Sequence, residues 1–199
     1  YYLDIVKDRL YTSHKTGLAR KSCQSVCLKL LKMINLWIAP ILSFTAEEMY
    51  RHIEGAKLKS VFLEEWIKYD VEMNDEEKDL GDILFSLKQP VSKKLEEARN
   101  NDIIGSSLDA TIRLGVKEEI YLKLADKRDE LKFIFISSEC HLEKTLTDDP
   151  VIVIEKNNNE KCDRCWHRNE PVGSIPEHEK LCSRCYENVF NNGETRKLG

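Results

Sequence analysis

The sequence has few of the residues that break helices, with only 8 glycines and 5 prolines among 199 residues. It contains no apolar run close to the roughly 20 residues that a membrane-spanning helix needs. Its first residues, YYLDIVKDRLY, are not those of a signal peptide. Because 41% of the residues are hydrophobic and 33% are charged, the sequence predicts a soluble, globular, helix-rich protein that does not enter a membrane.

Cysteine, by contrast, is abundant, with seven residues. Without a secretory signal, this number favours the reducing cytoplasm and metal binding over disulfide bonds. The chain also starts within a helical pattern, since Tyr2, Ile5, Val6 and Leu10 follow helical spacing with no capping residue before them. We therefore expect the sequence to be a piece of a longer protein.

Charge is divided unevenly along the chain. Residues 1–60 contain ten Lys and Arg against five Asp and Glu, whereas residues 61–160 contain 14 against 24. The basic first third favours contact with a polyanion, and a solvated helix face is the simpler alternative. The candidate phosphate-binding side chains share one side of a predicted helix: Arg20, Lys21, Lys29 and Lys32.

Residues 1–60 are predicted to form a helical bundle that is truncated at its N-terminus. A helix over residues 19–39 is expected to bury a stripe with three- and four-residue spacing, formed by Ala19, Cys23, Val26, Cys27, Leu30, Ile34 and Trp37. Pro40 ends this helix. Thr45 and Glu48 have the spacing of a capping box, which predicts a further helix that ends near Gly55.

Residues 61–158 are predicted to form a small α+β connector. Apolar spacing indicates a long helix over residues 75–100, and alternation indicates a strand over residues 108–116. Residues 131–136 and 151–154 are two further predicted strands, with a short helix around residues 118–128. A polar hinge at residues 157–161 leads into a separate module at residues 159–199. The predicted fold is thus mainly α with a small α+β unit.

The last module contains two Cys-x-x-Cys pairs separated by 16 residues, and these are the candidate metal ligands: Cys162, Cys165, Cys182 and Cys185. Two tight turns of this kind complete the tetrahedral thiolate shell of one structural zinc ion, with no position open for catalysis. Redox pairs and an iron–sulfur cluster are the alternatives. His167 and His178 are expected to lie near the site without binding the metal, because four thiolates suffice.

Each cysteine pair has the pattern Cys-x-Arg-Cys-aromatic. Arg164 and Arg184 either offset the negative charge of a zinc–thiolate site or point outward toward phosphate. Trp166 and Tyr186 either stack on nucleobases or cover the module as a lid, with the lid favoured for Tyr186. Arg168 is a further candidate for RNA binding in this module.

Several segments in this order resemble the C-terminal part of bacterial-type isoleucyl-tRNA synthetases: YYLDIVKDRLY, ARKSCQ, APILSFTAEEMY, IGSSLDATI, KCDRCW, LCSRC and GETRK. The resemblance implies a class I anticodon-binding helical bundle, an α+β connector and a zinc module with four cysteine ligands. It further implies binding to isoleucine tRNA as a monomer, and contact with a catalytic domain that lies outside this chain. That absent domain would use ATP for aminoacylation, and the fragment alone is expected to be non-catalytic.

Two other functions are open at this point. A similar zinc finger occurs in DNA-repair glycosylases of the formamidopyrimidine type, but those need an N-terminal Pro-Glu where this sequence has Tyr-Tyr. The chain could also be a protein-interaction module that zinc merely stabilises.

Overall fold

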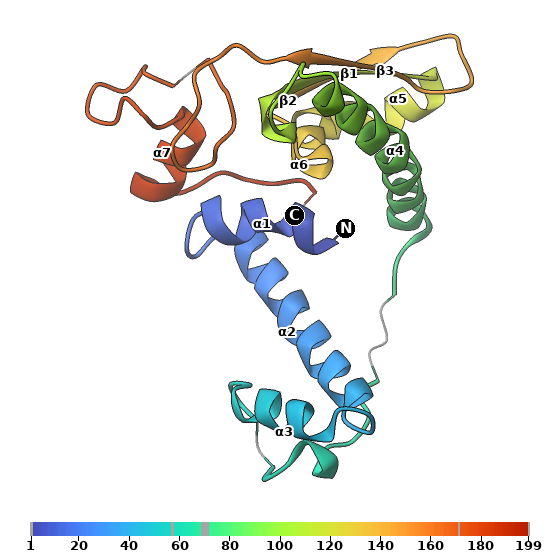
Figure 1. Ribbon diagram of the computed structural model, residues 1–199, viewed down its shortest axis with the longest axis vertical. Coiled ribbons are helices and arrows are strands. Elements are labelled where there is room, and N and C mark those ends of the chain that lie inside the picture. The colour runs from blue at the N-terminus through green and yellow to red at the C-terminus, as the bar shows by residue number, and fades with distance from the viewer. Residues whose placement is uncertain (1, 57, 69–71, 171, 199) are drawn as a thin grey trace. The chain divides into compact units, whose positions relative to one another are not determined.

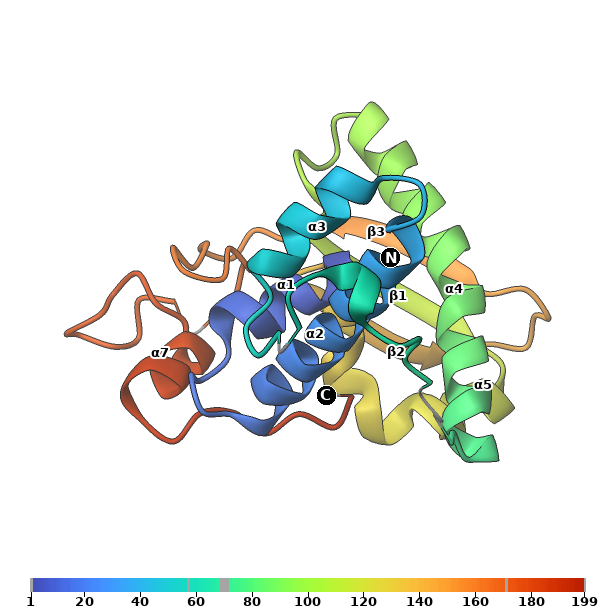
Figure 2. The same ribbon diagram turned by 90° about the horizontal axis from the view of Figure 1, so that it is seen from below.

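The computed structural model describes residues 2–56, 58–68, 72–170 and 172–198. The chain forms two compact units, one made of residues 1–20 and 73–199 and the other of residues 21–72. Among the residues that the structure describes, no helix combines the length and the hydropathy that a membrane span requires. Figures 1 and 2 show the α-helices and strands in chain order: α1 (Tyr2–Thr12), α2 (Leu18–Ile38), α3 (Ser43–Arg51), α4 (Asp75–Asn100), β1 (Ala110–Val116), α5 (Glu118–Leu124), α6 (Leu131–Phe135), β2 (Glu139–Lys144), β3 (Val151–Lys156) and α7 (Ser183–Phe190).

A three-stranded mixed sheet organises the larger unit. Its strand order is β2-β1-β3, with β1 parallel to β2 and antiparallel to β3. The central strand β1 buries Ala110, Ile112, Leu114 and Val116, and α4 and α6 contribute Leu87, Val91, Leu95 and Phe135 to the same core. On the opposite face, the exposed Arg113 pairs with Glu143 and Glu155 from the two neighbouring strands. One covered face and one solvated face are typical of a small α+β unit.

The predictions for α4, β1, β3 and the helix that begins at Glu118 are confirmed. The predicted strand over residues 131–136 is wrong, because Leu131–Phe135 form helix α6. A short apolar run cannot by itself distinguish a strand from a buried helix. Here the parallel pairing of β1 with β2 requires a crossover connection, and α6 is its last element. Strand β2, at residues 139–144, was not predicted because its sequence, ECHLEK, is mostly polar.

Residues 157–161, expected to be a hinge, are fixed to the sheet instead. Asn157 is buried, its side chain donates to Thr111 Oγ1 at 3.0 Å, and its backbone N–H donates to Asp109 O at 2.8 Å. The segment therefore positions the module that follows it.

The smaller unit has a small core at the C-terminal end of α2. Ala39, Ala46, Tyr50, Ile53 and Val61 form this core, with Leu36 and Ile38 packed against it. The predicted burial of the α2 stripe is largely wrong, since Val26, Leu30, Ile34 and Trp37 are between 36% and 52% exposed. An amphipathic stripe is buried only where another element packs along it, and within this unit α3 and the 3-10 turn Val61–Leu63 pack near the helix end.

Helix α3 differs from its prediction at both ends. It begins at Ser43 without a side-chain cap, so Thr45 lies inside the helix and not at its N-cap. The turn after α2 explains the early start, because Leu42 N–H bonds to Ile38 O at 2.7 Å and Ala46 N–H bonds to Leu42 O at 2.9 Å. The helix ends at Arg51, and Gly55 then takes a left-handed conformation with φ of 81°.

Candidate metal centre

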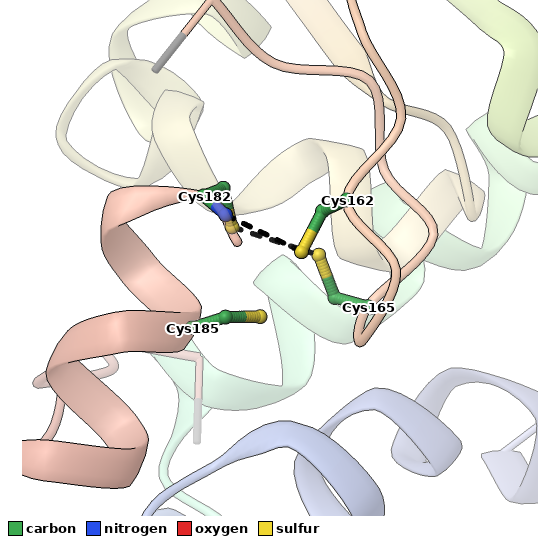
Figure 3. A group of neighbouring side chains, drawn as sticks. All are labelled: Cys162, Cys165, Cys182 and Cys185. Atoms are coloured by element: carbon green, nitrogen blue, oxygen red, sulfur yellow. Dashed lines mark hydrogen bonds between the residues drawn. The ribbon is translucent and has the colours of Figure 1, made fainter. Parts of the chain in front are cut away.

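The four predicted ligands come from two structural elements of the larger unit. Cys162 and Cys165 lie in a turn in which Trp166 N–H donates to Cys162 O at 2.9 Å, next to an isolated bridge between Lys161 and Arg168. Cys182 precedes the first residue of α7, and Cys185 lies in its first turn. Figure 3 shows the four side chains pointing toward one another.

The sulfur positions fit a tetrahedral zinc ion. All four sulfur atoms lie within 4.8 Å of one another, and the Sγ atoms of Cys165 and Cys182 are 3.7 Å apart. Zinc–sulfur bonds of about 2.3 Å in a tetrahedron place neighbouring sulfurs about 3.8 Å apart. The cysteines are all buried. A closed shell of four thiolates is the arrangement of a structural zinc site, and it leaves no position for a substrate.

Charge also favours a bound cation. Hydrogen bonds among the four cysteines raise the pKa of the Cys165 and Cys185 thiols and lower the pKa of the Cys162 and Cys182 thiols. Four thiolates so close together would repel one another at neutral pH unless a divalent ion lay between them. Other groups compensate part of the charge: Cys182 N–H donates to Cys162 Sγ at 3.4 Å, and the Arg164 guanidinium lies 3.8 Å from Cys185 Sγ.

The neighbouring histidines and aromatic residues have different roles. His167 is buried, and its Nδ1 lies 3.1 Å from Cys165 O, so it fixes the turn. His178 stacks on Phe190 at 4.3 Å, and Tyr186 lies 5.0 Å from the same ring. Trp166 is 59% exposed. Val172 and Leu181 pack against the cysteines and cover part of the site.

Arg164 and Arg184 connect the metal centre to α1. Arg164 donates to the carbonyl oxygens of Thr12 and Tyr11, at 2.5 and 3.2 Å, at the end of α1 where helix carbonyls lack partners. Arg184 donates to both carboxylate oxygens of Asp8, at 2.7 and 2.9 Å. Both guanidinium groups are therefore engaged within the protein.

The C-terminal segment completes this connection. Arg196 pairs with Asp8 and Glu194, and only 2% of its side chain is exposed. Its guanidinium lies 3.6 Å from the centre of the Phe133 ring, with that of Arg184 at 4.8 Å. We call Asp8, Arg184, Glu194 and Arg196 the buried ion cluster. The cluster links α1, α7 and the C-terminal tail, and its two arginines lie against the Phe133 ring.

Arg168 connects the module to the sheet. Its side chain donates to Asp109 Oδ1 at 2.8 Å and to Asn159 O at 3.1 Å, and its backbone N–H donates to Ser138 Oγ at 2.6 Å. The metal centre is thus attached to α1 on one side and to the start of β1 on the other.

The remaining candidate RNA-binding residues lie on α2. Arg20 is half-buried at the end of the larger unit's first segment. Lys21 and Lys29 are exposed, and Lys32 is half-buried, in the smaller unit. The sequence did not reveal Asp8, Phe133 or Arg196 as site residues, because they meet across as many as 188 positions and follow no local pattern.

Two family models match the chain, one over its first part and one over the zinc module. The family model described as "Anticodon-binding domain of tRNA ligase" matches residues 1–114, and "Zinc finger found in FPG and IleRS" matches residues 159–188. The chain belongs to the family of anticodon-binding domains of tRNA ligases. The match over residues 1–114 argues against the DNA-repair alternative, which rests on the zinc finger alone.

Isoleucine–tRNA ligases from several bacteria are similar in sequence to this chain. The chain is 38% identical to that of Shewanella amazonensis and 38% identical to that of Haemophilus influenzae strain PittGG, each over 98% of this chain. It is 40% identical to that of Ruthia magnifica over 100% of this chain. The chain spans about 22% of the length of these relatives. The resemblance to the C-terminal region of these ligases is confirmed.

We predict one zinc ion per chain, bound by the four cysteines. Replacing Cys182 with Ser should remove the ion and unfold residues 160–190, because binding energy on the order of 10 kcal/mol is folding energy in such modules. Helix α4 and the sheet should persist on their own core. Elemental analysis and circular dichroism of protein purified without chelator test this, and full zinc content in the Cys182→Ser variant would contradict it.

We also predict a pH-dependent contribution of the buried ion cluster. Burial raises the pKa of Asp8, but hydrogen bonds and charge from Arg184, with the charge of Arg196, outweigh this and hold the pKa well below its usual range. The stabilisation is therefore present above the unfolded pKa of about 3.9 and is lost as pH falls toward the folded pKa. Asp8→Asn should cost about 3–5 kcal/mol at pH 7, since it leaves buried arginines underpaired.

Thermal unfolding in excess zinc at pH 7, 5 and 3 measures this effect, with zinc content determined at each pH because protonation of the cysteines releases the ion. The difference in melting temperature between the wild type and Asp8→Asn should be smaller at pH 3 than at pH 7. Asp4→Asn is the matched control, because Asp4 pairs with Lys7 on the exposed side of the same helix. Equal melting temperatures for the two variants at pH 7 would disprove the role of the cluster.

Proposed function

We propose that this chain reads the anticodon arm of isoleucine tRNA on behalf of an isoleucine–tRNA ligase, in which a catalytic domain outside the chain uses ATP to join the amino acid to the tRNA. The observation that carries the proposal is the joint match to an anticodon-binding domain and a zinc finger within one chain. The seven cysteines are free, which supports a reducing cytoplasmic location. We propose that the region works as a monomer.

Trp166 is the zinc-module residue best placed to meet RNA. Its backbone φ of 66° is fixed by the Cys162–Cys165 turn, and Lys161 Nζ lies 5.2 Å from its ring centre. An exposed indole on a rigid turn, beside a cation, suits stacking on an unpaired base next to a phosphate. An apolar cavity of about 610 Å³ also lies beside it, lined in part by Ile5, Tyr11 and Trp166.

We assign the other candidate residues two different tasks. Arg20, Lys21, Lys29 and Lys32 on α2 would contact backbone phosphates, which gives affinity without base specificity. Arg164, Arg168 and Arg184 would act mainly by holding the zinc module in place, because their guanidinium groups already bond to α1, the tail and Asp109. Their direct contribution to RNA binding would be correspondingly small.

The proposal predicts separate effects for stacking and for charge. Binding of the full chain to isoleucine tRNA should weaken when the anticodon is changed. Trp166→Ala should weaken binding by about 5- to 100-fold, the loss of one stacked base at about 1–3 kcal/mol, with an unchanged salt slope. The double variant Lys21→Ala and Lys29→Ala should instead reduce the slope of the logarithm of the binding constant against the logarithm of salt concentration by about one or two.

Filter binding at several salt concentrations, with zinc content measured on the same preparations, separates these outcomes. If zinc-replete Trp166→Ala binds as well as wild type, the indole serves only the fold. If the chain does not distinguish isoleucine tRNA from bulk RNA, the protein-interaction alternative takes the place of the proposed function.

A further inference from the structure

Cys165 is the most exposed of the four cysteines in the metal centre, and it borders an apolar cavity. It is 7% exposed, whereas the other three are at most 2% exposed. The cavity has a volume of about 610 Å³ and is also lined by Tyr11 and Trp166, which are largely exposed, so it opens to solvent. Hydrogen peroxide is only slightly larger than water, which occupies about 30 Å³ in the liquid, and it can therefore enter this cavity.

A bound zinc ion would keep the Cys165 sulfur in its reactive form. Zinc holds its cysteine ligands as thiolates at neutral pH, and the thiolate is the form that peroxides oxidise. Cys140, outside the metal centre, gives the contrast. Burial raises the pKa of the Cys140 thiol to about 12, so this residue stays protonated at neutral pH. Peroxide should therefore react at Cys165 before it reacts at Cys140.

A second sulfur atom lies close enough to complete a disulfide. The Sγ atoms of Cys165 and Cys182 are 3.7 Å apart (Figure 3). A disulfide bond of about 2.05 Å requires them to approach by about 1.7 Å. Cys182 borders a smaller cavity of about 200 Å³ but is only 2% exposed, so we expect it to react with an oxidised Cys165 and not with peroxide first. The two residues thus have the arrangement of a peroxide-reactive cysteine beside a resolving cysteine.

We propose that Cys165 is a site of oxidation by hydrogen peroxide, reached through the 610 Å³ cavity, and that Cys182 converts the oxidised residue to a disulfide. In the first step the Cys165 thiolate attacks a peroxide oxygen, the O–O bond breaks, and a sulfenic acid and a hydroxide ion form. In the second step the Cys182 thiolate attacks the sulfenic sulfur, the S–S bond forms, and the S–O bond breaks to release a second hydroxide. Two protons from solvent convert the hydroxides to water, so the two thiolates lose two electrons and the peroxide gains them.

Oxidation would release the metal. The disulfide takes up two of the four thiolates, and the two that remain do not complete the tetrahedral shell that holds a structural zinc ion. Because the product is a disulfide, a thiol reductant and fresh zinc would restore the site. The metal centre would then be a reversible redox switch.

The switch would act on the turn that carries Trp166. Loss of zinc removes the ion that holds this turn to the start of α7, and tRNA binding should weaken by about 5- to 100-fold, the loss of one stacked base. This consequence rests on the proposed function, because it takes Trp166 to stack on RNA. The oxidation of Cys165 does not depend on RNA.

Titration of the zinc-loaded chain with hydrogen peroxide is the test. Released zinc is followed with a chromogenic chelator, sulfenic acid is trapped with dimedone, and disulfides are mapped by mass spectrometry of peptides. The dimedone adduct should form at Cys165, one zinc ion per chain should be released as the disulfide to Cys182 appears, and dithiothreitol with added zinc should reverse both. Zinc retained at millimolar peroxide, or a first adduct at another cysteine, would overturn the assignment, and so would a disulfide between Cys162 and Cys165.

Leu108→Trp tests the route through the cavity. Leu108 lines the cavity from the segment before β1, so a larger ring there should narrow access to Cys165 and slow the release of zinc by peroxide several-fold. Leu122→Trp is the matched control, because Leu122 is 64% exposed on α5, away from the cavity lining, and it should react as the wild type does. Equal rates in the two folded variants would overturn the route. If Leu108→Trp fails to fold, the adduct and the disulfide of the wild type still decide the question.

Measurement of tRNA binding on the same preparations separates the oxidation site from the proposed function. A chain that selects isoleucine tRNA but keeps its zinc in peroxide would overturn the oxidation site and leave the proposed function standing. A chain that forms the Cys165 adduct and the disulfide but does not select isoleucine tRNA would support the oxidation site and overturn the proposed function.

Discussion

A buried carboxylate with two arginine partners holds the parts of the larger unit in register. Asp8 on α1 forms ion pairs with Arg184 of α7 and with Arg196 of the C-terminal tail. The Arg196 guanidinium also lies over the Phe133 ring. Removing these charges from water is costly, so the cluster is stable only when every member is present. A bound zinc ion would therefore act beyond its four ligands, because it would tie the first cysteine turn to α7, and α7 carries Arg184, which bonds to Asp8 on α1.

Local sequence patterns predict much of this architecture, but they do not predict all of it. Two Cys-x-x-Cys pairs predict their own convergence, because each turn presents both sulfurs on one side. The periodicity of residues 75–100 predicts α4 for a similar reason. The helix at Leu131–Phe135 escaped prediction because the parallel pairing of β1 and β2 decides its conformation. The buried ion cluster was not predicted because its members are distant in sequence, and each one by itself resembles an ordinary surface charge.

The fixed attachment of the zinc module gives the exposed Trp166 its significance. Arg164 holds the first cysteine turn to the end of α1, and Arg168 holds it to Asp109 at the start of β1. The sequence allowed Arg164 and Arg184 either to offset the charge of the zinc site or to bind phosphate, and it made Arg168 a candidate for RNA binding; the guanidinium groups of all three bond within the protein. An aromatic ring on so constrained a turn would lose little conformational entropy on stacking. Base recognition and phosphate binding would then fall to different side chains, as is usual in RNA-binding proteins.

We expect zinc, the buried ion cluster and α1 to act as one cooperative structure. Hydrogen exchange of backbone amides in zinc-loaded and chelator-treated protein tests it most directly. Zinc removal should abolish protection in α7 and in the last turn of α1, at residues 9–12, while α4 stays protected by the sheet core. Unchanged protection of α1 after complete zinc removal would show that α1 is held independently of the metal.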